Sequence, residues 1–344
     1  MLGHALFHEK TRIRGEYVAL SDVLTYFLRH LKSATETYIG EELTEVVLGR
    51  PVQFVDDDEE ANRAAQGDLE AAARRIGFKR IELQLEPIAA ALEYETGVNR
   101  EETVLIVDIG GGTSDFSVVR VSPERAQAAD RTSDILGNLG IRVGGTDFDR
   151  ALSMAHVMPL LGLGAIYGAK RLQMPRAPYV DLSTWARVNF LYEPKVMSEL
   201  RMLRREASRP ELLERFLRLI EARNCHRLLG QVEDSKIDLT GQEQACVALG
   251  YLDDALAATI TRPQFADAIA EHLERIGQCV GSVLREAGTA PDRIDTVFLT
   301  GGSSIAFPVQ ARIRSMLPDA RIATGDMLGS VGKGLGLDAR RKFG

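Results

Sequence analysis

One short stretch of the sequence carries the residues best suited to chemistry. It reads Asp108-Ile-Gly-Gly-Gly-Thr-Ser-Asp115, so a carboxylate stands on each side of a run of glycines. Successive glycines cost conformational entropy, but they let consecutive backbone N–H groups converge on an anion such as a phosphate. The carboxylates can hold a metal ion, or its waters, against that phosphate. An ordinary two-residue turn needs fewer glycines, so the pattern favours a phosphate-binding hairpin over a simple corner.

Two apolar segments must position this hairpin. Thr103–Val107 is a β-branched run without alternation, which is typical of a strand buried on both faces. Ser114–Val121 is predicted to be the second strand. A further buried strand, Thr296–Thr300, runs into a Gly301-Gly302 turn. Backbone at such a turn commonly contacts a nucleotide base or ribose, because ligands lie at the carboxyl ends of sheet strands.

The rest of the chain alternates predicted helices and strands, which indicates α/β layering around a largely parallel sheet. Before the hairpin we expect a helix from an N-cap at Ser21 to Gly40, a strand at Glu45–Pro51, a helix to about Ile76, a strand at Ile81–Leu85 and a helix at Ile88–Glu95. After it we expect loop or strand edge at 137–145, a helix at 146–160, an irregular insertion at 162–200, arginine-rich helix at 197–230, one long helix from Thr261 to Ala287, and helices at 309–317 and 330–337.

Composition narrows the class of protein. A length of 344 residues favours two domains or one two-lobed unit. The net charge of −7 gives no sign of binding to nucleic acid or to an anionic membrane. No apolar run approaches the roughly 20 residues that span a bilayer. The cysteines Cys225, Cys246 and Cys279 are far apart and form no metal or redox motif, so we expect reduced thiols in a cytoplasmic protein.

Taken in order, the motifs resemble the nucleotide-binding domain of DnaK-type (70-kDa heat-shock) chaperones, within the actin-like ATPase superfamily. The motifs that carry the resemblance are Glu86-Pro-Ile-Ala-Ala-Ala-Leu-Glu-Tyr94, which looks like the first connecting motif, the hairpin at 107–115, Gly144-Gly-Thr-Asp-Phe-Asp149, the adenosine-type motif Leu299-Thr-Gly-Gly-Ser-Ser304, and a second connecting motif at 330–335. The resemblance covers most of residues 16–344 and is weakest at 150–230, which points to the YegD-like branch.

The resemblance implies a two-lobed, ribonuclease-H-like α/β fold that binds ATP or ADP with Mg²⁺ in an interlobe cleft. Glu86 would orient the attacking water, and Asp108 and Asp115 would position the magnesium. The residues implied to contact the nucleotide are Gly110, Gly111, Gly112 and Thr113 at the phosphates, Gly144 and Gly145 from the opposite lobe, Glu233, Lys236 and Thr240 at the ribose and adenine, and Gly301, Gly302 and Ser303 at the adenosine. Glu233 and Lys236 could equally be ordinary exposed helix residues.

Two departures from the family pattern bear on activity. The family begins with a first phosphate hairpin of the type Asp-x-Gly-Thr, but the only Asp-x-Gly in this sequence is Asp108-Ile-Gly110. Positioning and charge stabilisation supply nearly all phosphoryl-transfer catalysis. We therefore expect an N-terminally truncated chain with an incomplete first lobe, and weak or absent ATPase activity. The sequence ends soon after the second connecting motif, so we also expect the peptide-binding half to be missing from this chain.

Three functional hypotheses remain open. The preferred one is a YegD-like chaperone ATPase domain, with client proteins or co-chaperones as partners. The second is a non-catalytic nucleotide-sensing or protein-interaction module, and the third is another actin-like enzyme such as a sugar kinase. We expect residues 1–101 to be the remainder of the first lobe, residues 102–145 and 262–344 the large subdomain of the second lobe, and residues 146–261 its small subdomain.

Overall fold

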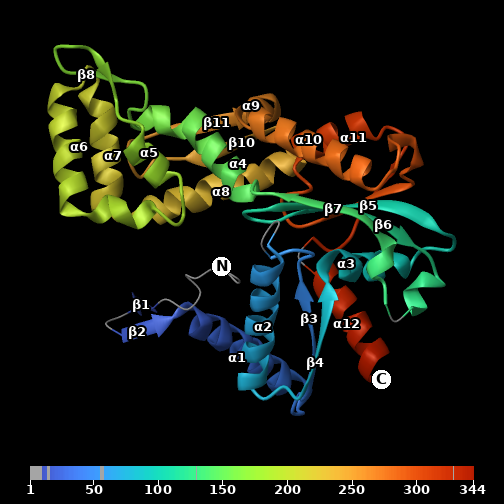
Figure 1. The fold of residues 1–344 in the computed structure, drawn as a ribbon. Coiled ribbons are helices and arrows are strands. Elements are labelled where there is room, and N and C mark those ends of the chain that lie inside the picture. Colours follow the sequence, from blue (N-terminus) through green and yellow to red (C-terminus); the bar gives the residue numbers. More distant parts are fainter. Residues whose placement is uncertain (1–9, 14–15, 55–57, 129, 328) are drawn as a thin grey trace. The chain divides into compact units, whose positions relative to one another are not determined.

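The computed structural model describes residues 10–13, 16–54, 58–128, 130–327 and 329–344. The chain divides into two compact units. The first unit consists of residues 1–106, 117–138 and 323–344, and the second consists of residues 107–116 and 139–322. The elements of both units are labelled in Figure 1.

The central element is a five-stranded sheet, in the order β13-β12-β5-β6-β7. Its strands are β5 (Glu102–Ile109), β6 (Ser114–Val121), β7 (Ile135–Ile141), β12 (Thr296–Thr300) and β13 (Arg321–Thr324). The strands β5 and β6 are predicted correctly, and the apolar residues 104–107 of β5 are all buried. The glycine-rich segment 110–113 connects these two neighbouring strands, so the expected hairpin forms. The strands β7 and β13 are not predicted as such from the sequence.

The first unit contributes the helices and strands that precede the hairpin, together with the last helix of the chain. These are β1 (Lys10–Ile13), β2 (Glu16–Ala19), α1 (Leu20–Ile39), β3 (Glu45–Arg50), α2 (Glu59–Arg75), β4 (Arg80–Leu85), α3 (Glu86–Glu95), η2 (Arg125–Gln127), η3 (Thr132–Asp134) and α12 (Ser330–Phe343). The strands β3 and β4 pair in parallel as a separate two-stranded sheet. The sequence pattern alone does not separate this sheet from the five-stranded one.

Capping interactions mark the ends of helices in the first unit, and the predicted N-cap at Ser21 is wrong. Gly40 ends α1 in the left-handed conformation at φ 79°, and the Asp58 side chain caps α2 by accepting a hydrogen bond from the Ala61 amide. Ser21 is not an N-cap, because β2 passes directly into α1 and Ala19 takes the cap position. The Ser21 carbonyl instead accepts a hydrogen bond from Thr25 Oγ1 inside the first turn.

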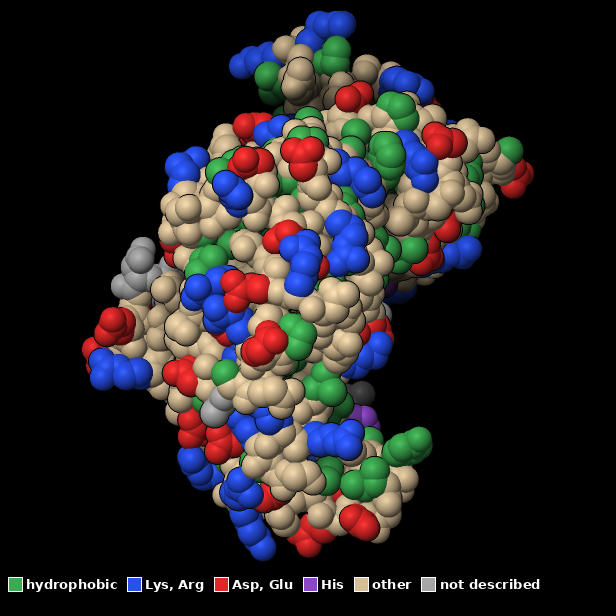
Figure 2. Space-filling model, turned by 90° about the vertical axis from the view of Figure 1, so that its right-hand side faces the viewer, with side chains coloured by type: hydrophobic (Ala, Val, Ile, Leu, Met, Phe, Trp, Pro, Cys, Tyr) green, Lys and Arg blue, Asp and Glu red, His purple; other side chains and the backbone are tan. Residues whose placement is uncertain are grey.

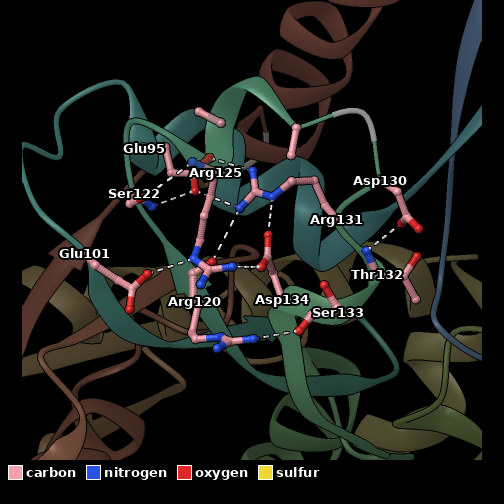
Figure 3. Close-up of polar contacts among 12 residues, drawn as sticks. Glu95, Glu101, Arg120, Ser122, Arg125, Asp130, Arg131, Thr132, Ser133 and Asp134 are labelled. Carbon is pink, nitrogen blue, oxygen red and sulfur yellow. Dashed lines mark hydrogen bonds and ion pairs between the residues drawn. The ribbon is translucent and has the colours of Figure 1, made fainter.

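A buried network of charges fixes the β6–β7 connection onto the end of α3 (Figure 3). The Arg131 guanidinium donates two hydrogen bonds to the Glu95 carboxylate, at 2.9 and 2.8 Å, and a third to Asp134. Arg125 donates to the same Asp134 and, at 2.9 Å, to Glu101. The side chains of Arg131 and Glu95 are only 1% exposed. Because each charge in this interior is paired, the loop cannot leave α3 without exposing an unpaired ion.

The second unit is mostly helical outside the large sheet. Its further elements are α4 (Gly145–Leu152), the π-helix η4 (Ser153–Val157), η5 (Met158–Leu161), β8 (Ile166–Tyr167), β9 (Leu172–Gln173), α5 (Ala177–Leu182), η6 (Val188–Tyr192), α6 (Pro194–Glu206), α7 (Pro210–Glu221), α8 (Cys225–Gly241), β10 (Gln244–Ala248), β11 (Ala257–Thr261), α9 (Arg262–Ala268), α10 (Ala270–Glu286), η7 (Pro291–Arg293) and α11 (Phe307–Met316).

The structure of this unit differs from the expectations in three places. The long helix after Thr261 is two helices, because Ile269 leaves helical geometry at φ −103° and ψ 11°. The antiparallel hairpin of β10 and β11 is missed, since its alternating burial lies beside strong helix signals. The insertion at 162–200 is also more regular than expected, with α5, η6 and the start of α6.

The arginine-rich segment is used mainly for ion pairs with nearby carboxylates. Arg201 pairs with Glu221 at 2.8 Å, Arg204 pairs with Glu214, and Arg215 pairs with Asp253 at 2.7 Å. Lys and Arg side chains are interspersed with Asp and Glu over the face drawn in Figure 2. The three arginines Arg201, Arg204 and Arg215 therefore lie beside acidic partners.

Within the described residues, no helix combines the length and apolar character needed to cross a membrane.

Candidate functional site

The tip of the glycine hairpin presents backbone amides to solvent. The Gly110 amide closes the turn by donating to the Thr113 carbonyl at 3.0 Å. Residues 111–113 are exposed. Within the described part of the chain, the amides of Gly111, Gly112 and Thr113 donate to no protein acceptor. Such neighbouring free donors form a concavity that suits an anion.

The Gly144-Gly145 segment is hydrogen-bonded to this hairpin. The Gly145 amide donates to the Gly110 carbonyl at 2.9 Å, and the Thr146 amide and hydroxyl both donate to the Gly111 carbonyl at 2.8 Å. A Cβ at Gly144 would lie 2.5 Å from the Gly112 nitrogen, so the backbone could not approach this closely with any other residue there. The glycines of this motif therefore serve the contact with the hairpin.

The turn after β12 approaches the same place. The Ser303 amide donates to the Ile109 carbonyl at 3.0 Å. Gly301 adopts φ 76°, and a Cβ there would lie 2.4 Å from Asp108 Oδ1. Ser303 is buried and the neighbouring Gly302 is exposed. Three glycine-containing segments that are far apart in sequence thus meet within the second unit.

The two hairpin carboxylates differ in environment. Asp108 is half-buried, and burial, followed by the charge of Asp115, raises its pKa to about 6. Asp115 is exposed and faces Gly140, where a Cβ would lie 2.7 Å from Asp115 Oδ1. Among the described residues, no group of three or more His, Cys, Asp or Glu side chains could enclose a metal. Mg²⁺ commonly binds through one or two carboxylates, waters and substrate phosphates, so this pair fits magnesium and does not fit a closed protein cage.

The predicted residues of α8 have distinct surroundings. Lys236 is buried, with its Nζ 2.9 Å from Asp149 Oδ1 and 3.4 Å from the Gly145 carbonyl oxygen. Glu233 is half-buried one turn earlier on α8. Thr240 is also half-buried, and its carbonyl accepts a hydrogen bond from Arg262 at 2.8 Å. Lys236 thus contacts the glycine segments through its hydrogen bond to Gly145.

Glu86 belongs to the other unit. It is the first residue of α3, followed by a proline at a favoured position, and it is half-buried. Its Cγ lies 3.5 Å from where a Cβ on Gly49 would stand. The structure therefore brings together within one unit the hairpin, Gly144-Gly145, Gly301–Ser303 and Lys236, whereas Glu86 belongs to the first unit.

Sequence reasoning missed two residues at this site. Thr146 bonds the hairpin with both its amide and its hydroxyl, and Asp149 pairs with Lys236. Both lie in the Gly-Gly-Thr-Asp-Phe-Asp motif, where only the glycines are given roles. The signal was present in the polar residues that follow these glycines at helical spacing.

A cavity of about 550 Å³ lies elsewhere, within the first unit. It is lined by the end of α3, the segment after β6 and the last turns of α12. None of the predicted site residues lines it, so the glycine segments of the second unit remain the stronger candidate.

Comparison with known families agrees with the motif order. The family model described as Hsp70 protein matches residues 6–159 and 218–323, well over half of the chain. The unmatched residues 160–217 correspond to the insertion with α5, η6 and α6, and to the first part of α7. The mixed α/β architecture is the actin-like ATPase fold expected of that family. The chain belongs to the Hsp70 family.

Proposed function

We propose that this chain binds MgATP on its second unit and acts as a slow, YegD-like member of the Hsp70 ATPases. As an Hsp70-family protein it contains a chaperone-type ATPase domain. The observation that carries the nucleotide proposal is the meeting of three glycine segments at a hairpin whose tip amides have no protein acceptor among the described residues. Phosphates are bound in this way at other glycine-rich nests.

Each part of the nucleotide has a candidate partner in this proposal. The amides of Gly111–Thr113 bind the β- and γ-phosphates, with the Thr113 hydroxyl as a further donor. Asp108 and Asp115 hold Mg²⁺ and its waters, and the ion supplies charge neutralisation of the phosphates when bound. Gly301–Ser303 line the adenosine, with Glu233 at the ribose.

The hydrolytic step rests on Glu86, which would orient the attacking water. We propose that hydrolysis by the 344-residue chain is slow, because its sequence holds a single Asp-x-Gly phosphate hairpin. Hydrolysis would then be separable from binding. That separation also supports the second candidate, a nucleotide-sensing module that captures a protein partner without hydrolysis. Clients or co-chaperones are the expected class of partner.

Calorimetric titration tests the binding proposal. The chain is titrated with ATP in the presence and absence of Mg²⁺, beside Asp108→Ala and the matched control Asp234→Ala, an exposed aspartate on α8. We expect magnesium-dependent binding that only Asp108→Ala removes. Absence of ATP binding by the wild-type chain would refute the proposal.

A second variant separates the two candidate functions. Glu86→Gln should leave ATP affinity within about twofold and abolish the residual hydrolysis, if Glu86 orients the water. Nucleotide-dependent capture of a client protein that survives Glu86→Gln would favour the sensing module. Hydrolysis that is unchanged in Glu86→Gln would remove this residue from the mechanism.

A further inference from the structure

A buried ion pair lies directly behind the glycine segments of the second unit. The Nζ of Lys236 on α8 is 2.9 Å from Oδ1 of Asp149 on α4, and the two side chains are 10% and 6% exposed. The same ammonium group donates to the Gly145 carbonyl at 3.4 Å. Gly145 and Asp149 are four residues apart on α4, so they lie on one face of that helix. Lys236 therefore contacts α4 at its first residue and again one turn later.

The contacts of the ammonium group limit what else it can do. A lysine has three N–H donors, and two of its nearest oxygens here belong to α4. Removing two charges from water is expensive, and a buried pair rarely repays that cost in stability. A buried pair is thus better explained by what it positions than by the stability it adds.

The residue that Lys236 touches on α4 is also the one that bonds the phosphate hairpin. The Gly145 amide donates to the Gly110 carbonyl at 2.9 Å. Gly145 also packs closely against the turn after β12. A Cβ added at Gly145 would lie 2.2 Å from Ser303 Oγ and 3.2 Å from Lys236 Nζ. Displacement of the first turn of α4 would therefore disturb the hairpin and the Gly301–Ser303 turn together.

We propose that Lys236 is a positioning residue of the phosphate subsite: paired with Asp149, it ties α4 to α8 and holds Gly144-Gly145 against the hairpin. This inference rests on the proposed nucleotide site and assigns a different task to Lys236 than the resemblance implies. It also gives Asp149 a role, since Asp149 anchors the ammonium that contacts Gly145.

The test compares a whole nucleotide with its phosphate part alone. Wild type, Lys236→Met and Asp149→Asn are titrated with Mg²⁺ and either ATP, tripolyphosphate or adenosine. A positioning role predicts that both variants weaken tripolyphosphate, and ATP with it, by the same factor of about tenfold or more, because the phosphate subsite itself is displaced. Weakening of ATP and adenosine without any change for tripolyphosphate would make Lys236 a nucleoside ligand and overturn the inference.

Control variants make the readout specific. Asp234→Asn makes the same chemical change as Asp149→Asn at an exposed position of α8, and it should leave all three affinities unchanged. Glu233→Gln, one turn from Lys236, should weaken ATP but not tripolyphosphate, because Glu233 is proposed to contact the ribose. Equal losses of affinity in Asp234→Asn and Asp149→Asn would show a general effect of charge, and they would contradict a specific role of the Lys236–Asp149 pair.

The double variant tests the pairing independently of nucleotide. If the two residues act as a unit, Asp149→Asn/Lys236→Met should unfold at nearly the same urea concentration as the worse single variant. Additive losses would show that the residues act separately. Failure of wild type to bind either ATP or tripolyphosphate would refute the proposed function. The comparison of single and double variants by urea unfolding would still decide whether Lys236 and Asp149 act as a pair.

Discussion

Gly334 of α12 packs directly on the backbone of Ala89 in α3: a Cβ at Gly334 would lie 1.7 Å from the Ala89 carbonyl oxygen. Both residues are buried. The helices α3 and α12, which contain the segments that resemble the two connecting motifs, thus cross with no side chain between them at this point. Only glycine permits this approach.

Replacing a glycine of α12 by alanine should change the free energy of unfolding by an amount that depends on whether the glycine faces α3. Gly334→Ala should lower the free energy of unfolding by roughly 1–3 kcal/mol, because the new methyl group forces the helices apart. Gly336→Ala on the same helix meets no atom within 4 Å, and it should raise stability by up to about 1 kcal/mol through helix propensity. Urea unfolding measures both, and equal effects would contradict the tight crossing.

Loss of Arg131 should be among the most destabilising single changes in the first unit. Arg131→Met leaves the buried carboxylate of Glu95 without its cation and Asp134 with Arg125 alone, and we expect a loss of roughly 3–5 kcal/mol. Arg201→Met removes an exposed pair with Glu221 and should cost less than about 1 kcal/mol. Thermal and urea unfolding measure the loss of stability in the two variants. A loss in Arg131→Met as small as that in Arg201→Met would show that solvent enters the network.

Asp108 should reduce the stability of the free protein. Its pKa is raised to about 6 by burial and by Asp115, so at pH 7.5 the folded state holds a charge that its surroundings disfavour. Without magnesium, Asp108→Asn should raise the free energy of unfolding by on the order of 1–2 kcal/mol. The same variant should lose magnesium-dependent ATP binding. Lower stability of Asp108→Asn in the presence of a chelator would contradict this interpretation.

The free energy of unfolding should depend on pH through Asp149, and the direction of its pKa shift fixes the sign of that dependence. Burial raises its pKa from 3.8 to about 6, with Lys236 opposing and Glu233 adding to the shift. The folded state therefore binds a proton more tightly than the unfolded state, and wild type loses stability relative to Asp149→Asn as pH rises from 3.8 to about 6. We expect a change on the order of 2 kcal/mol, flat above that window. Urea unfolding at several pH values measures the difference, and an opposite slope would exclude the raised pKa.

The parts of the site that could be predicted from the sequence are those set by local backbone demands. The run of glycines at 110–112 is best explained by a turn that exposes backbone amides, and Gly301 follows the largely apolar run Thr296–Thr300. The strand–turn–strand arrangement around the hairpin followed from the same local pattern. The hairpin and the turn after β12 depend on neighbouring residues, and both form in the structure. The ligand roles of these glycines stay predictions.

Pairings between distant residues could not be predicted in this way. Glu95 and Arg131 are 36 residues apart, and nothing in either neighbourhood marks the other as its partner. Lys236 and Asp149 belong to different helices whose contact depends on the whole second unit. The division of the segment after Thr261 into two helices likewise depends on packing, because the apolar periodicity continues through Ile269.

The assignment of Glu86 to one unit and of the glycine segments to the other has a consequence for evolution. If Glu86 orients the attacking water and the glycine segments bind the nucleotide, as proposed above, substitutions that disable hydrolysis and substitutions that disable nucleotide binding would accumulate in different stretches of the gene. A lineage released from selection for turnover could lose the acid at position 86 and still keep every glycine of the hairpin. Comparing substitution rates in these two stretches among relatives would reveal whether selection preserves a catalyst or a ligand-gated scaffold.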